Sequence, residues 1–463
     1  MEMMIINIVC AIASIVFCVI APNGYDAAFV HTVVGTFLVQ NVLYLCCNGR
    51  KNKLGFEFFF CVAFFFVNFS YPVFYYESDP DYGFFWMKWN KLVISRATAI
   101  AYLGYAFYML GLTKWFRMKR EEPMTPTFHI TMNQYLCFFS IMVGAFAGYL
   151  IFGGWTAMRD VYAGGGNIKD VGLYSYFNVI FALSAYLVAM FVFRMPRTKW
   201  WFYLLTIGVC LLLVLSTGSR SMSLAIMLIL LTGWNNNVRR FRIWEIACIT
   251  LLGVTVLFLM MELRGEHDWL YQLKHLKINH LPDMFFDLTI NGRNLYVLVD
   301  YAEHHAYTHF HGMLIDLATP IPGMAKHIVE WTQEPYELLC AQDLTTYLRM
   351  GAGATWGLGC NMIGDAFRSF GYVGVAVSMF CIGWAVKESY YASAYNIYAY
   401  VIYYLLVSYS VFYTRAPILF PPRVLLWTLL IVWMVNTLTI RWKDVRDAYN
   451  TLCNKLLSKK RQP

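Results

Sequence analysis

Charged residues are scarce in this chain of 463 residues. Lysine, arginine, aspartate and glutamate make up 14% of it, whereas hydrophobic residues make up 59% and the mean hydropathy is +0.51. Soluble domains carry about 25% charged residues, so this composition excludes an ordinary soluble globule. The charges stand in short blocks between apolar stretches of about 20 residues, which is the length of a helix that crosses a hydrocarbon core. The sequence therefore predicts an all-α polytopic membrane protein.

The first apolar run, Met3–Ala21, lacks a basic segment before it. A secretory signal carries such a segment ahead of a short apolar core, so we expect no cleavable signal and interpret the run as a span. The 12 cysteines do not indicate a disulfide framework, because most lie in apolar runs, where cysteine behaves as a small hydrophobe. Cys340 and Cys360 are the pair that could bridge outside the cytoplasm, and their spacing does not decide whether they do.

The apolar runs and the charged breaks between them predict about 12 transmembrane helices. Their approximate ranges are 3–21, 27–46, 56–74, 92–112, 130–152, 173–193, 201–216, 222–234, 244–262, 369–386, 396–413 and 424–440. Alternate connections are strongly basic, as at Arg50–Lys53 and Arg239–Arg242, and the others are acidic or neutral, as at Glu77–Asp81. The positive-inside rule then places both termini in the cytoplasm and one long loop outside.

This pattern divides the chain into four parts. Residues 1–262 hold transmembrane helices 1–9, and residues 263–368 form the large outer loop, with partly helical structure. Residues 369–440 hold helices 10–12, and residues 441–463 form a basic cytoplasmic tail. A connection as long as the outer loop is usually functional rather than passive. The site is therefore expected in that loop and at the membrane surface beside it.

Arginines are expected at the outer side of the membrane. They are Arg220, Arg264, Arg293, Arg349, Arg415 and Arg423. Arg220 ends Thr217-Gly218-Ser219-Arg220 between two apolar runs, where an ionisable group is costly and by default marks a functional site. Guanidinium groups stay charged and grip phosphate oxygens in a bidentate fork, so together the six predict a cationic cradle for a diphosphate. Snorkelling towards lipid phosphates is the alternative, and it stays open above all for Arg349 and Arg423.

Histidines gather in the outer loop, with a cluster between Glu303 and His311. Histidine and carboxylate groups are the usual general bases near neutral pH. We predict that His309 or His311 takes the proton of an acceptor hydroxyl. The sequence does not rank the acidic alternatives, which are Glu266, Asp268, Asp300 and Asp343. A solvated loop with no catalytic histidine is the plain alternative.

Two further patterns carry weaker signals. His305 and His309 stand four residues apart and would share a helix face at a metal site, but no second ligand group follows at a recognisable spacing. We therefore predict no metal.

The glycine-rich segment 351–359 follows no predicted strand. It therefore favours close approach to a substrate or close helix packing over nucleotide binding. The lone Arg96 inside the fourth span is expected to be paired or snorkelling.

Together these residues resemble the Wzy family of O-antigen and capsular repeat-unit polymerases, including the enterobacterial common antigen type. In this family a Gly-Ser/Thr-Arg element follows one span and an arginine closes the next, before a large loop with a Pro-rich turn. A Gly-rich lead into a helix and late arginines then follow. The matching segments are Thr217–Leu224, Glu262–Gly265, Gly292–Gly323 and Leu344–Gly374, followed by Arg415 and Arg423.

The resemblance implies a metal-independent, inverting glycosyltransferase of the helical membrane (GT-C-like) type, with no cofactor. Such an enzyme moves a growing glycan from undecaprenyl diphosphate to a new lipid-linked repeat unit. It lies in the bacterial inner (plasma) membrane, with the large loop and the active site facing the periplasm. Its partners would be the undecaprenyl-diphosphate-linked oligosaccharide, the lipid bilayer and a chain-length regulator, and no nucleic acid.

Two other functions stay open. An O-antigen ligase, which transfers glycan to lipid A core, shares the span number, the large loop and the need for arginines. A glycolipid flippase also has about 12 spans, but repeat-related halves and charges along a central path are typical of transporters. Here the charges gather on one side beside a single long loop. This arrangement favours chemistry at the membrane surface.

Overall fold

The computed structural model describes residues 2–47, 54–82, 85, 87, 89–113, 128–156, 172–195, 200–217, 219–242, 244–246, 248–249, 251–253, 255, 286–351, 354 and 357–439. Regular structure in these ranges is entirely helical, and they contain no strand. The predicted all-α class is therefore confirmed. The predicted span 244–262 lies mostly outside the described residues, as does the basic tail 441–463.

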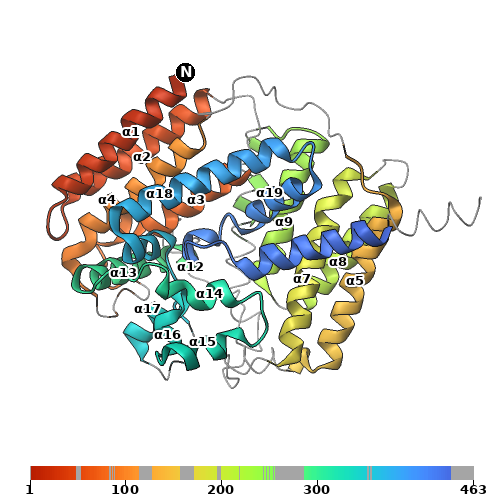
Figure 1. Cartoon of the computed structure of the whole chain (residues 1–463). Helices are drawn as coiled ribbons and strands as arrows, with labels where there is room; N and C mark the ends of the chain where they lie inside the picture. The colour runs from red at the N-terminus through yellow and green to blue at the C-terminus, as the bar shows by residue number, and fades with distance from the viewer. Residues whose placement is uncertain are drawn as a thin grey trace, which may run out of the picture.

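Long helices form the body of the described part (Figure 1). They are α1 (Glu2–Ile20), α2 (Ala27–Cys47), α3 (Phe56–Asn68), α4 (Ile94–Gly111), α5 (Met132–Ile151), α7 (Leu173–Phe191), α8 (Trp200–Ser216), α9 (Arg220–Asn237), α18 (Met362–Ala392), α19 (Ile397–Tyr409) and the helix Pro422–Thr439. Shorter helices gather at one end of them, at the bottom of the view. These are α12 (Phe286–Thr289), α13 (Gly292–His304), α14 (Leu314–Ala318), α15 (Met324–Thr332), α16 (Tyr336–Leu339) and α17 (Ala341–Met350).

Seven helices in the described ranges are long and apolar enough to cross a membrane. They are Met3–Ile20, Ala27–Cys46, Lys91–Gly111, Met132–Ile151, Leu173–Arg194, Met362–Ala392 and Pro422–Thr439. Large apolar side chains stay exposed on several long helices, among them Val19, Ile151 and Leu212 at 79%, 78% and 69%. Faces of this kind suit hydrocarbon rather than water. The chain is thus a helical protein of the membrane-embedded kind, while the expected number of about 12 spans and their orientation stay predictions.

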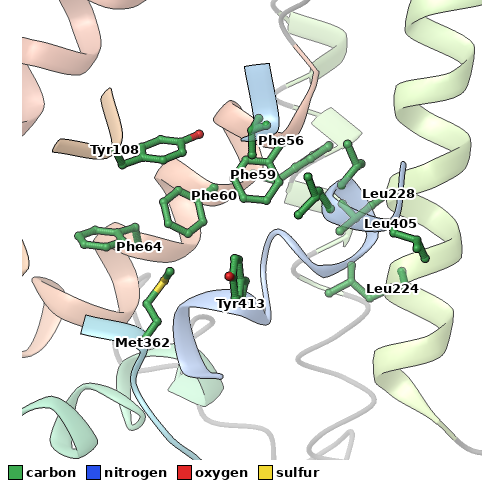
Figure 2. Close-up of a cluster of buried hydrophobic side chains, with 14 of the residues drawn as sticks. Phe56, Phe59, Phe60, Phe64, Tyr108, Leu224, Leu228, Met362, Leu405 and Tyr413 are labelled. Carbon is green, nitrogen blue, oxygen red and sulfur yellow. The ribbon is translucent and has the colours of Figure 1, made fainter. Parts of the chain in front are cut away.

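An aromatic core joins α3, α4, α9 and α19 (Figure 2). Phenylalanines of α3 face Tyr108 of α4 across it, and the Phe60 and Tyr108 rings lie 4.8 Å apart between centroids. Leu224 of α9 and Leu405 of α19 close the opposite side. Aromatic pairs at this spacing stabilise a core beyond the area they bury. The core therefore gives the adjoining polar segments a rigid base.

Helices α4 and α18 cross closely at two glycines. A Cβ on Gly111 would collide with the Phe380 carbonyl oxygen, and one on Gly383 with the Tyr108 carbonyl oxygen. Small residues allow helix backbones to approach in this way inside membranes. Arg96, near the start of α4, is ion-paired with Glu303 of α13, and its other terminal nitrogen donates to Asn23. The expectation that Arg96 is paired is therefore confirmed.

Helix α18 is longer than the predicted span 369–386 and is broken inside. It begins at Met362, where the Asn361 side chain caps the backbone N–H groups of Ile363 and Gly364, and its 31 residues end at Ala392. Gly371 has φ 66° and ψ −155°, which interrupts the helical geometry. The part after this break is about 32 Å long, the thickness of one hydrocarbon core. We therefore expect the break at the membrane surface and the first half of α18 at the polar end of the molecule.

Segment 56–74 is also not one straight helix as predicted. The α-helix ends at Asn68, and a π-helical turn, Tyr71–Tyr75, follows. Pro72 lacks the N–H group that would bond the Asn68 carbonyl, and its ring crowds the preceding turn. The proline thus ends the α-helix early.

Candidate functional site

Three separate segments meet at Leu358–Cys360, which we call the junction. Asn294 of α13 donates its amide to the Leu358 carbonyl at 2.7 Å. From α17, the Thr346 hydroxyl accepts from the Leu358 N–H at 2.8 Å, and the Thr345 hydroxyl donates to the Gly359 carbonyl. Gly359 has φ 78°, a conformation that favours glycine. The junction therefore serves as a turn on which two helices are fixed.

The third segment is the turn that carries Arg415. The Cys360 N–H donates to the Arg415 carbonyl at 3.3 Å. The Arg415 guanidinium lies over the Phe412 ring, 4.9 Å from its centroid, and the residue is half-buried. Its backbone position is thus fixed by the junction, while the charged head keeps partial access to solvent.

Two further predicted arginines stand beside the junction. Arg293 precedes Asn294 and is only 2% exposed, and Arg349 follows Thr345 by one turn of α17. Burial, and then the charge of Arg349, lower the pKa of Arg293 to about 10. Burial also lowers the pKa of Arg349, an effect that Asp300 opposes. Because the charge of Arg349 acts on Arg293, the two cations lie within electrostatic range of each other, and an anion near Arg293 would relieve the repulsion.

The other predicted arginines lie elsewhere or outside the described residues. Arg423 donates to the Thr319 carbonyl at 2.7 Å and packs over Tyr176 and Trp427, so it fastens the α14 turn to the helix Pro422–Thr439. Arg220 is the first residue of α9, after the Ser219 cap, and its side chain lies outside the described part. Arg264 lies wholly outside it. Arg293 and Arg349 thus interact with each other, and Arg415 is bonded to the junction through its backbone. Convergence of the six guanidinium groups on one site stays a prediction.

A buried ion pair that was not predicted as part of the site lies one to two turns along α18. Arg368 is 1% exposed, and its Nε donates to Asp365 at 2.9 Å while a terminal nitrogen donates to the Gly312 carbonyl at 3.0 Å. The other Asp365 oxygen accepts from the Ile418 N–H at 3.0 Å. The sequence signal for this pair is an Asp and an Arg three residues apart in an apolar helix, because ionisable groups in such a helix are expected to have a role.

Asp316 of α14 completes this group of charges. Its Oδ2 is buried without a hydrogen-bond partner among the described residues. Burial raises the pKa of Asp316 to about 7; the carboxylate of Asp365 adds to the rise, and Arg368 counteracts it. A carboxyl group with a pKa near neutral is suited to exchange a proton at working pH. Sequence reasoning could not find Asp316, since it stands in no motif.

The loop that carries His309 and His311 lies against α18 just before its break at Gly371. The Thr308 and His309 N–H groups donate to the Arg368 and Ser369 carbonyls at 3.1 and 2.9 Å. Exposed carbonyls at a broken membrane helix need such partners, so the loop satisfies them. His309 packs its ring on Phe370, with 5.4 Å between centroids, and His311 lies 3.6 Å from the Glu334 carboxylate. About 12 Å of helix separates this loop from the junction.

His305 and His309 do not form a metal site, and Cys340 and Cys360 do not form a disulfide. Because α13 ends at His304, the residues His305 and His309 do not share a helix face, and His305 stacks on Tyr301 instead. Within the described ranges, no three His, Cys, Asp or Glu side chains gather closely enough to hold a metal. Cys340 and Cys360 are both free and buried in different apolar clusters.

Comparison with protein-family models, with curated proteins and with solved structures finds no match to this chain. The chemical reading of the site therefore depends on its geometry. The junction offers fixed cations that can bind a phosphate group. Next to it, a carboxyl group titrates near neutral pH and can accept a proton.

Proposed function

We propose that the chain is a membrane glycosyltransferase that polymerises lipid-linked repeat units. The observation that supports it is the junction, which ties together the three segments that carry Arg293, Arg349 and Arg415. Two of these cations, Arg293 and Arg349, lie within electrostatic range of each other. Fixed guanidinium groups stabilise the charge that grows on a departing diphosphate. Arg220, Arg264 and Arg423 belong to the same proposal as further contacts to the donor.

In the proposed reaction the acceptor hydroxyl attacks the anomeric carbon of the donor sugar. A carbon–oxygen bond forms on one face while the bond to the lipid diphosphate breaks on the other, which inverts the configuration. The bonding pair leaves with the diphosphate, held by the arginines, and the hydroxyl proton passes to a base. Asp316 is the base we favour, because it borders Asp365 near the junction, whereas His309 and His311 lie further along α18.

The proposal extends to the setting of the enzyme. Undecaprenyl diphosphate would carry the growing glycan in a bacterial inner membrane, with the junction facing the periplasm and a chain-length regulator as partner. No cofactor or metal has a role in the proposed step, so polymerisation is expected to continue in excess chelator. Loss of activity that zinc or magnesium restores would contradict this part.

The test is complementation of a deletion strain, read on a glycan gel. We expect Arg349→Gln and Arg415→Gln to leave membrane protein levels unchanged and to give single repeats in place of a ladder. Arg239→Gln is the matched control, because Arg239 is a surface arginine paired with Glu245 away from the junction. A full ladder from both junction variants would overturn the proposal. A bare core with accumulated lipid-linked polymer in the deletion strain would indicate a ligase instead.

A further inference from the structure

A lateral groove opens between α1 and α18, with α4 as its floor. Its volume is about 410 Å³. Ile15, Cys18 and Val19 form one wall, Leu103 and Phe107 the floor, and Tyr372, Val373 and Ala376 the other wall. This volume is within the range of about 300–1,000 Å³ that is usual for small-molecule sites. The lining is apolar except for the tyrosine, so only hydrocarbon would fill it without loss of hydrogen bonds.

The groove lies where a lipid would be present. All three of its helices are candidate spans, and its rim residues Val19 and Val373 are 79% and 71% exposed. Tyr372 follows the Gly371 break, which places it at the membrane surface, and tyrosine is common at that level. The groove thus runs from head-group depth into the hydrocarbon.

Polar groups stand at the surface end of the groove. Gly371, the neighbour of Tyr372, is close to Tyr307, since a Cβ there would lie 2.8 Å from the Tyr307 hydroxyl. Asn23, just after the α1 wall, accepts from Arg96 at 2.8 Å. Glu303 and Asn23 each engage one terminal nitrogen of Arg96, and a guanidinium has five N–H donors, so it can bind a further acceptor. A phosphate at this end would be bound by charge-assisted hydrogen bonds.

We propose that this lateral groove binds one hydrocarbon chain of a membrane lipid, with the lipid's phosphate at Arg96. The inference needs only that α1, α4 and α18 cross a membrane, and it holds whether or not the chain is a polymerase. A glycerophospholipid and a polyprenyl phosphate share the required chemistry. Both place a phosphate at the surface and a long chain below it.

The test is retention of lipid by the purified protein in mild detergent, measured by native mass spectrometry. Phosphatidylglycerol, undecaprenyl phosphate and dioleoylglycerol are added separately. We expect one molecule of at least one phosphate lipid to stay bound. Ala376→Trp and Val19→Trp fill the groove from opposite walls and should reduce retention about tenfold or more.

Matched controls come from the same two helices. Val377 and Val16 are 56% and 48% exposed but do not line the groove, so Val377→Trp and Val16→Trp should retain lipid as the natural chain does. Because the two walls are tested independently, misfolding of one variant leaves the other informative. Arg96→Gln should weaken retention of the phosphate lipids and leave dioleoylglycerol unchanged.

Three outcomes would overturn the proposal. The natural chain could retain none of the three lipids. The lining and control variants could retain lipid equally. The lining variants could instead split a dimer of the natural chain, which would show that a second copy occupies the groove. Retention of phosphatidylglycerol alone or undecaprenyl phosphate alone would support it and identify the source of the phosphate.

Discussion

At the scale of single residues, Asp316 is the group whose chemistry depends most on its surroundings. Its pKa of about 7 compares with an ordinary value of 3.8, and the first cause is burial. A general base must be deprotonated to act. The polymerising activity should therefore rise as the pH passes through about 7.

We predict that Asp316→Asn lowers the turnover rate by about 10²–10⁴-fold, as loss of a general base does. The measurement is single-turnover transfer in detergent over a range of pH. Glu330→Gln is the control, because Glu330 is an exposed carboxylate on α15. A variant that keeps the natural rate and pH profile would remove Asp316 from the reaction.

The same pKa predicts how stability depends on pH. Because the folded-state pKa lies above the ordinary value of 3.8, the folded chain keeps this proton to a higher pH than the unfolded chain. The contribution to stability is complete below pH 3.8 and is lost as the pH rises through about 7. Asp316→Asn should flatten that loss, measured as the unfolding midpoint between these pH values. An unchanged slope would contradict the assigned pKa.

Arg368 has a structural role that can be separated from chemistry. Arg368→Met should destabilise the fold by about 3–5 kcal/mol, because it leaves the Asp365 carboxylate buried without its cation. The double change with Asp365→Asn should recover part of this loss, since no charge is then left behind. Thermal unfolding of the single and double variants checks both statements. Equal stability of the two would show that the pair is not coupled.

At the scale of elements, the break in α18 makes Gly371 irreplaceable. A Cβ at this position would lie 2.8 Å from the Tyr307 hydroxyl oxygen, and φ 66° is strained for any other residue. We expect Gly371→Ala to destabilise the chain by about 1–3 kcal/mol and to increase proteolysis within 304–313. Gly144→Ala in α5 is the control, because a Cβ there would meet nothing within 4 Å. Equal proteolysis of the two variants would show that the loop does not depend on the break.

Sequence patterns predicted most long helices but not their interruptions. The lengths of the apolar runs predicted helices at 27–46 and 173–193, and the observed helices α2 and α7 begin at the predicted residues, Ala27 and Leu173. The start of α18 at Met362 escaped prediction, because the cap Asn361 and the turns after it read as polar loop. Packing by α13 and by the turn at Gly312, which lie far away in sequence, makes that polar half-helix part of the core.

At the scale of the whole molecule, orientation in the membrane is the prediction with the widest consequences. The C-terminus is expected in the cytoplasm and the helices of 286–350 outside. Alkaline phosphatase inserted after Gln333 should be active, and green fluorescent protein at the C-terminus should fluoresce. Gln333 is an exposed residue at the end of α15, so the insertion avoids the core. The opposite pair of signals would reverse the topology and remove the junction from the periplasm.

Composition alone predicted the all-α class of the molecule, and the positions of the arginines predicted part of the candidate site. Arg293, Arg349 and Arg415 could be nominated because charge is rare in such a chain. The meeting of their three segments at the junction could not, since it depends on hydrogen bonds between residues more than 50 positions apart, such as that from Asn294 to Leu358. Asp316 was missed for a related reason: its pKa depends on Asp365 and Arg368, which lie about 50 residues away in sequence.

The histidine loop and the broken helix form one mechanical unit. If the loop left its place, the Arg368 and Ser369 carbonyls would lose the N–H partners that they have there. Each orphaned group costs about 1–3 kcal/mol when water is excluded. The loop therefore stabilises the broken form of α18, and the two segments should unfold together.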